Sequence, residues 1–364
     1  MTLTHKERVR RAIYRQPLDY FPTQIDFTGN DLGRVANHYG VRPEEVDRLV
    51  DNHLAPTFSF GESYYFRDNP ALIAKAIEFN LTRVDDVKQV IFDCWGVGWS
   101  LTSEGVWVTD HPFKSLDNFA NYRFPDPNAD GLMYYTDQIV KQAGDEYFVL
   151  ALQHIGLFER AWSLRGFENL LIDIYQNRSF VEELLDRITD YQVAVAKRYV
   201  AAGIDGVRFG DDYGTQKGLI MKDKHWRELF KPRLKRIYSV YQEAGLPVMQ
   251  HSCGDLQKIL PDFVDLGLNM LHPVQPQAMP IRDLVEKYGE KLSFFGGIDT
   301  QELLPFGTPE QIRASTKECV ELLGRHGGYM VAPSQEIMSD VPLENIEALV
   351  NAVKEYRYLV PNPL

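Results

Sequence analysis

Residues 247–255 read Pro-Val-Met-Gln-His-Ser-Cys-Gly-Asp, a short apolar run that ends in polar and reactive side chains. The same arrangement recurs along the second half of the chain. Each run is short and apolar, as expected of a strand that is buried on both faces in a parallel sheet. The other runs are residues 147–152, 206–209, 269–271, 292–295 and 328–331.

Helical patterns separate these runs, at residues 181–202, 224–244 and 309–323. Alternation of strands and helices predicts a parallel sheet with right-handed crossovers. Six such units, with two further strands placed upstream, favour an α/β fold of the (β/α)₈ barrel type. A doubly wound open sheet is the alternative, but no Gly-x-Gly-x-x-Gly follows an early strand.

The first part of the chain carries additions to the barrel. Val9 and Ile13 among basic residues predict an amphipathic N-terminal helix that starts near Thr4 and ends at Pro17. Residues from about 84 to 108 are β-prone and glycine-punctuated, which predicts a β-hairpin insertion. We expect one domain over residues 1–364, in which residues 1 to about 125 hold the extension, the hairpin and the first barrel elements, and residues 126–364 form the main barrel.

The composition is that of a globular protein, with 44% hydrophobic and 25% charged residues. The net charge of -12 argues against nucleic acid or an anionic membrane surface as a partner. The 3 cysteines are widely spaced and odd in number, which disfavours a disulfide framework. Because the chain also lacks a long apolar run and a secretory leader, we expect a cytoplasmic protein.

In a barrel of this type the active site forms at the carboxyl ends of the strands. His251 and Cys253 are two positions apart at such an end, so their side chains project to the same side. An imidazole and a thiolate suit zinc, and a catalytic zinc needs one more protein ligand. Glu336 is the first candidate, with Gln335 or Asp211 as alternatives. The structural alternative is that Cys253 is a buried residue and His251 a hydrogen-bonded one.

Further polar residues follow the other strands. Asp211 and Asp212 are candidate catalytic acids or bases, although helix capping or a solvated turn explains them equally well. His154, Tyr213, His272 and Asp299 are candidate substrate contacts. For Asp299 the residues Asp299-Thr-Gln-Glu302 also form a capping box.

At these residues the sequence resembles the uroporphyrinogen decarboxylase superfamily, which includes the haem-pathway decarboxylase and zinc-dependent, cobamide-linked methyltransferases. The resemblance covers nearly the whole chain. It is densest from Gly206 to Leu349, in the stretches 209–216, 249–255, 295–301, 327–333 and 340–345. The resemblance implies a distorted (β/α)₈ barrel with a deep cleft at the strand ends.

The decarboxylase branch of that superfamily has an arginine-rich segment near its N-terminus, which holds the substrate carboxylates. The matching residues 22–29 read Pro-Thr-Gln-Ile-Asp-Phe-Thr-Gly and contain no arginine. A substrate with many carboxylates needs several cations around it, so this difference disfavours porphyrinogen decarboxylation. The methyltransferase branch holds zinc on a His-x-Cys pair and a later Cys. His251 and Cys253 match the pair, and Ser334-Gln335-Glu336 stands where the later Cys is found, which puts Glu336 first as third ligand.

The sequence therefore predicts a zinc-dependent methyltransferase that moves a methyl group between a small O-, S- or N-methylated substrate and a corrinoid on a partner protein, as in the demethylase components of O-demethylation. The resemblance also implies a homodimer. Two alternatives remain open: a metal-free decarboxylase or lyase that acts on a carboxylated substrate through Asp211 and Asp212, and a non-catalytic tetrapyrrole- or corrinoid-binding protein.

Overall fold

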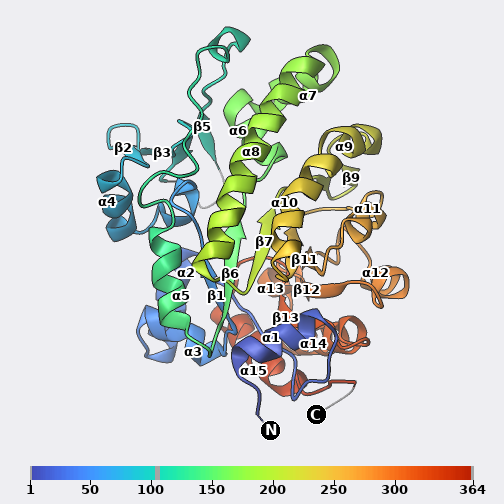
Figure 1. Cartoon of the computed structure of the whole chain (residues 1–364). Helices are drawn as coiled ribbons and strands as arrows, with labels where there is room; N and C mark the ends of the chain where they lie inside the picture. Colours follow the sequence, from blue (N-terminus) through green and yellow to red (C-terminus); the bar gives the residue numbers. More distant parts are fainter. Residues whose placement is uncertain (1, 103–106, 362–364) are drawn as a thin grey trace.

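The computed structural model describes residues 2–102 and 107–361. At its centre lies a parallel sheet with the strand order β1-β6-β7-β10-β11-β12-β13 (Figure 1). Every residue of β6, β11, β12 and β13 is buried, which is why these strands read as continuous apolar runs. The strands are Leu54–Thr57 (β1), Phe148–Gln153 (β6), Gly206–Gly210 (β7), Val248–His251 (β10), Met270–Val274 (β11), Ser293–Ile298 (β12) and Tyr329–Pro333 (β13).

An extended segment, residues 22–27, fills the gap between β13 and β1. On one side its backbone exchanges two hydrogen bonds with Val331, at 2.9 and 3.1 Å, and on the other side it accepts one from His53 at 3.1 Å. With this segment in the eighth position the sheet closes on itself. The expected (β/α)₈ barrel is therefore confirmed, and the two upstream strands are this segment and β1.

Helices surround the barrel (Figure 1). The expected helix at 309–323 begins at a capping box, in which Thr308 accepts a hydrogen bond from the Gln311 backbone. The expected single helix at 224–244 is two helices that meet at Phe230, because Pro232 cannot donate to the preceding turn. The helices that follow the barrel strands are Tyr134–Ala143 (α5), Phe158–Arg165 (α6), Phe167–Gln176 (α7), Arg178–Ala202 (α8), Asp223–Leu229 (α9), Lys231–Glu243 (α10), Leu260–Asp265 (α11), Ile281–Tyr288 (α12), Leu303–Phe306 (α13), Pro309–Leu323 (α14) and Leu343–Tyr356 (α15).

The N-terminal helix is present as α1 (His5–Ile13), capped by the side chain of Thr4. It is followed by α2 (Gly29–Tyr39), α3 (Val46–Val50) and α4 (Pro70–Glu78). The predicted hairpin is the central part of a larger antiparallel sheet with the order β2-β3-β4-β5. Its strands are Arg83–Asp85 (β2), Val90–Phe92 (β3), Gly98–Ser100 (β4) and Val108–Asp110 (β5), and residues 103–106 of the expected hairpin lie outside the described residues. Two further short strands, Gly214–Thr215 (β8) and Gly218–Leu219 (β9), form a hairpin after β7.

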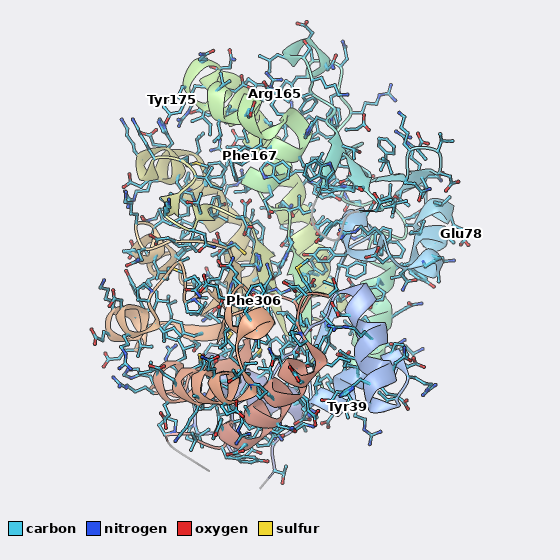
Figure 2. The ribbon with its side chains drawn as sticks, turned by 180° about the vertical axis from the view of Figure 1, so that it is seen from behind. Tyr39, Glu78, Arg165, Phe167, Tyr175 and Phe306 are labelled. Atoms are coloured by element: carbon cyan, nitrogen blue, oxygen red, sulfur yellow. The ribbon has the colours of Figure 1, made fainter. Side chains whose placement is uncertain are left out.

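The antiparallel sheet and helices α6 and α7 lie at the end of the molecule toward which β6 points (Figure 1). Phe167 and Tyr175 of α7 are 42% and 58% exposed, and both are labelled in the upper part of Figure 2. None of the helices in the described part of the chain is long and apolar enough to cross a membrane.

Candidate metal and substrate site

A cavity of about 250 Å³, the inner cavity, lies at the carboxyl ends of the barrel strands. Its walls combine aromatic rings with polar and ionisable groups. The residues that matter for its chemistry are Asp26, Tyr65, His154, Glu159, Arg208, Asp212, His251, His272 and Glu336. These come from most of the strands and from the extended segment, so the closed barrel is what brings them together.

Three potential metal ligands converge beside this cavity, and two of them, Asp212 and His251, line it. His251 Nε2 lies 3.6 Å from Asp212 Oδ1 and 3.8 Å from Cys253 Sγ, and the three ligand atoms lie within 4.8 Å of one another. His251 ends β10, Cys253 follows it, and Asp212 follows the neighbouring strand β7. The parallel pairing of β7 with β10 sets their proximity.

The separations of these atoms can be compared with the geometry of a tetrahedral zinc site. Zinc-to-ligand distances of about 2.0–2.3 Å place neighbouring ligand atoms roughly 3.3–3.6 Å apart. The observed 3.6 and 3.8 Å need only a small contraction. A sulfur, an imidazole nitrogen and a carboxylate oxygen are also ligands that zinc accepts. The residues present therefore fit a zinc ion with one open coordination position.

Asp211 does not line the cavity. Its carboxylate accepts hydrogen bonds from the backbone N–H groups of Leu157, Phe158 and Glu159 at 2.8, 2.9 and 2.8 Å. The Tyr213 hydroxyl donates to the same carboxylate at 2.5 Å, and both side chains are fully buried. Asp211 thus occupies the N-terminus of α6, where free N–H groups favour a carboxylate. This geometry gives Asp211 and Tyr213 a structural contact at the start of α6, whereas their expected catalytic and substrate contacts stay predictions.

Asp299 organises the turn that leads into α13. It accepts from the backbone N–H groups of Gln301, Glu302 and Leu303 at 2.9–3.0 Å, and from the side chain of Gln277. These four donors hold the pKa of Asp299 below its usual value although burial acts the other way. These contacts lie within the turn before α13, whose N-cap residue is Glu302, so the Asp299–Glu302 capping box is not formed.

The three candidates for the third ligand differ in position. Glu336 lines the inner cavity but does not belong to the ligand group of Asp212, His251 and Cys253. Gln335 donates from Nε2 to Cys253 Sγ at 3.6 Å. The residue that completes the group is Asp212. Side chains alternate between the two faces of a strand, so Arg208, Gly210 and Asp212 fall on one side and Asp211 on the other. This two-residue period was the signal in the sequence that could have distinguished the two aspartates.

Both candidate histidines line the cavity and share one partner, Arg208. Arg208 Nε donates to His154 Nε2 at 3.1 Å, and Arg208 Nη1 lies 3.3 Å from His272 Nε2. His272 Nδ1 lies 2.9 Å from His251 Nδ1. Burial, and then the charge of Arg208, lower the pKa of His154 and of His272. Burial also lowers the pKa of His251, to about 4, so all three rings are neutral at physiological pH.

Several cavity groups were not found from the sequence. One of them is Glu159, whose pKa burial raises well above its usual value. Glu336, which the sequence did single out, has a pKa that burial together with Asp26 raises to about 7. The Tyr65 hydroxyl is buried and has no hydrogen-bond partner among the described residues. Tyr65 and Asp26 lie in the first 70 residues, in segments whose sequence shows neither a helical nor a strand period. Only the closed barrel places them at the site.

A second cavity, the outer cavity, adjoins the site on the Cys253 side. It measures about 650 Å³ and shares Gln335, Glu336 and Met338 with the inner cavity. Asp212 and His251 line the inner cavity, whereas Cys253 lines the outer one. The metal-ligand group therefore lies between two open spaces.

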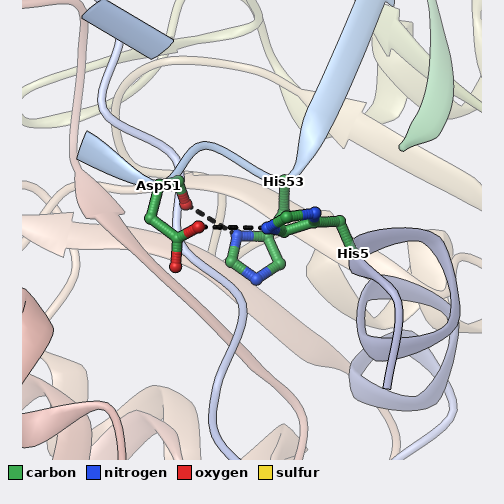
Figure 3. Close-up of side chains that lie close together, drawn as sticks. All are labelled: His5, Asp51 and His53. Atoms are coloured by element: carbon green, nitrogen blue, oxygen red, sulfur yellow. Dashed lines mark hydrogen bonds and ion pairs between the residues drawn. The ribbon is translucent and has the colours of Figure 1, made fainter. Parts of the chain in front are cut away.

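His5, Asp51 and His53 form a second group of potential ligands, and Figure 3 shows their side chains close together. His53 directly precedes β1, so this group lies at the end of the barrel where the strands begin. His5 contacts Glu146 at 2.6 Å and Asp51 at 3.0 Å through its two ring nitrogens. His53 is held by Arg8 at 3.0 Å and by the Asp51 carbonyl oxygen at 2.8 Å. All four ring nitrogens thus have partners, and the Arg8 guanidinium disfavours a cation. We interpret this group as a hydrogen-bonded cluster that closes the base of the barrel.

The family model described as uroporphyrinogen decarboxylase (URO-D) matches residues 90–356, and the chain belongs to this family. A solved structure described as a methyltransferase from Methanosarcina mazei superimposes with a TM-score of 0.68, over 97% of this chain and 99% of that one, at 21% identity. That likeness shows the fold.

The relatives of this chain include proteins described as methyltransferases and proteins described as uroporphyrinogen decarboxylases. Methylcobamide:CoM methyltransferase MtbA of Methanosarcina acetivorans is 23% identical over 98% of this chain and 99% of its own length. Methylated-thiol--coenzyme M methyltransferase of Methanosarcina mazei is 29% identical, but the match covers 54% of this chain and about half, 51%, of that relative. Uroporphyrinogen decarboxylase of Methylococcus capsulatus is 22% identical over 95% of this chain and 96% of its own length.

Proposed function

We propose that this protein is a zinc-dependent methyltransferase, which moves a methyl group between a small O-, S- or N-methylated substrate and a corrinoid carried by a partner protein. The observation that carries the proposal is the convergence of Asp212, His251 and Cys253 at the wall of a cavity. Near-full-length similarity to a methylcobamide:CoM methyltransferase supports the choice of reaction and of a corrinoid as partner.

Asp212, His251 and Cys253 would hold the zinc ion in this proposal. Zinc supplies Lewis acidity, which makes the heteroatom of the methylated compound a better leaving group. Cys253 is oriented by two contacts: its backbone N–H donates to Asp212 Oδ1 at 2.8 Å, and Gln335 approaches its sulfur. These contacts hold two of the proposed ligands in place before the metal arrives.

Glu336 takes the part of the proton donor in the proposal, a role that the sequence analysis assigned to Asp211 or Asp212. With a pKa of about 7, its carboxyl group is protonated in about half of the molecules at pH 7. It borders both cavities and can deliver that proton to a departing oxygen, nitrogen or sulfur. Asp212 is used as a metal ligand and Asp211 as a helix cap.

The cavity itself favours methyl transfer over decarboxylation of a tetrapyrrole. The relevant feature is the charge of the residues around the inner cavity. Among the described residues that line it, Arg208 is the only arginine or lysine. One guanidinium cannot balance the many carboxylates of a porphyrinogen.

The experiment is methyl transfer with purified protein loaded with zinc, reduced cobamide as acceptor, and a panel of methoxylated, methylthio and methylamine compounds. We expect formation of methylcobamide with at least one class, and its loss after removal of zinc by a chelator. Active protein that contains no metal would contradict the zinc assignment. Absence of exchange over the whole panel would contradict the reaction.

A pair of cysteine variants provides the matched control. Cys253→Ala should lose bound zinc, as measured by elemental analysis, and should lose methyl transfer. Cys319→Ala removes a thiol that is 2% exposed and donates to the Gly297 carbonyl oxygen at 3.3 Å, away from the cavity. Zinc content should remain that of the unmodified protein in this control.

A further inference from the structure

A chain of hydrogen-bonded side chains connects the proposed zinc ligand His251 to the half-buried guanidinium of Arg208. His251 Nδ1 faces His272 Nδ1 at 2.9 Å, and His272 Nε2 faces Arg208 Nη1 at 3.3 Å. Arg208 is held on its other side, because its Nε donates to His154 Nε2 at 3.1 Å. The four residues come from neighbouring strands, so the barrel sets their order in space.

The donors and acceptors in this chain determine where each ring carries its proton. Arginine only donates, so His272 Nε2 must accept and the proton of a neutral His272 must lie on Nδ1. That N–H donates to His251 Nδ1. His251 then carries its own proton on Nε2, the nitrogen that faces Asp212 and Cys253.

This arrangement conflicts with metal binding at the same nitrogen. A metal-bound Nε2 must offer a lone pair, so the proton of His251 has to be on Nδ1. From there it donates to His272 Nδ1, which must now accept. His272 in turn carries its proton on Nε2, where it can no longer accept from Arg208. With neutral rings, the zinc-bound form and the Arg208–His272 hydrogen bond exclude each other.

We propose that His272 is a positioning residue for the zinc ligand His251, and that zinc binding exchanges the tautomers of both rings and releases Arg208 Nη1 from His272 toward the cavity. This inference rests on the proposed zinc site. The protons balance: the His272 Nδ1 proton passes to His251 Nδ1, the His251 Nε2 proton leaves to solvent, and His272 Nε2 takes one up from solvent. Arg208 becomes available to an acceptor atom of the substrate only in the metal-bound form.

The direct test is ¹⁵N NMR of protein labelled at histidine, before and after one equivalent of zinc. Protonated and unprotonated ring nitrogens have distinct ¹⁵N shifts, so the tautomer of each ring can be assigned. We expect Nε2–H on His251 and Nδ1–H on His272 without metal, and the opposite tautomers with zinc. Bound zinc with no change of tautomer at His272 would overturn this inference alone, whereas failure to bind zinc would overturn the proposed metal site as well.

Zinc affinity, measured by competition with a chelator, gives a second test, in which two variants should change the affinity in opposite directions. His272→Phe removes the acceptor for His251 Nδ1–H, and zinc should bind about 10–100-fold more weakly. Arg208→Gln removes the competing donor and can accept from His272, so zinc should bind about tenfold more tightly. A merely structural role would weaken binding in both variants, and that result would overturn the inference.

Arg67→Gln is the matched control for charge. Arg67 lies over the ring of Tyr64, a residue of the inner cavity, at 4.2 Å, and acts on Glu336 electrostatically. The substitution removes a positive charge near the cavity without altering the histidine chain. If it tightens zinc binding as much as Arg208→Gln does, charge alone explains the effect and the hydrogen-bond competition is wrong.

Discussion

Arg160 Nη1 lies 2.6 Å from Asp93 Oδ2, and this ion pair joins helix α6 to the antiparallel sheet. Both side chains are at most 1% exposed. Asp93 also accepts hydrogen bonds from the backbones of Trp95 and Val97 and from the indole of Trp99. The insertion is therefore attached to the barrel by a desolvated charge pair beside the tryptophans, which the sequence analysis could identify only as β-prone residues.

Breaking this pair should strongly destabilise the fold. Arg160→Met leaves Asp93 charged and buried, and we expect a loss of about 3–5 kcal/mol in the free energy of unfolding, measured with urea. The control is Arg282→Met, because the Arg282–Glu318 pair is 67% and 58% exposed. That change should cost less than about 1 kcal/mol. Equal losses in the two variants would contradict the importance of the buried pair.

Two neighbouring aspartates should give opposite phenotypes. Asp211→Asn loses the charge that caps α6, so the free energy of unfolding should fall by about 1–3 kcal/mol while zinc affinity is retained. Asp212→Asn should leave stability nearly unchanged and weaken zinc binding by more than about 100-fold, since a direct ligand should matter more than an outer partner. Urea unfolding and chelator competition measure the two effects. The assignment is wrong if the phenotypes are exchanged.

Tyr65 provides a test of the substrate side of the inner cavity. Its hydroxyl has no partner among the described residues, so Tyr65→Phe should change stability by less than about 0.5 kcal/mol. If the hydroxyl donates to substrate, KM for the methylated compound should rise about tenfold, as expected for the loss of one hydrogen bond. Tyr175→Phe, at an exposed position on α7, is the control and should leave KM unchanged. An unaltered KM in Tyr65→Phe would remove this residue from the binding site.

The cluster at the base of the barrel should make stability depend on pH. Hydrogen bonds to Asp51 and Glu146 raise the pKa of His5. A histidine whose pKa is higher in the folded state than in the unfolded state stabilises the fold when it is charged. This contribution is fully present below the unfolded pKa of about 6.5, and it is lost as the pH rises through the folded pKa. His5→Gln should therefore cost more stability at pH 6 than at pH 9, measured by urea unfolding. His38→Gln, which alters a surface contact with Glu347 at 3.7 Å, is the control variant. An equal loss for His5→Gln at both pH values would exclude a charged His5.

The barrel and part of its site followed from the sequence. Runs such as 247–255 combine a buried parallel strand with the polar residues of its carboxyl end, and this local pattern predicts both the fold and the pair His251 and Cys253. The distance of 3.8 Å between their ligand atoms agrees with an inference that needs only the period of a strand.

The remaining choices depend on contacts between residues far apart in the chain. The period of the strand could have separated Asp211 from Asp212, but sequence alone could not show that Asp211 meets the N-terminus of α6, more than 50 positions away. Nor could it place Arg208 between two histidines or Tyr65 in the cavity. Closure of the barrel brings these groups together, and the burial that follows sets their protonation. Local pattern therefore determined which elements form, whereas the tertiary structure decided which side chains meet and in which charge state.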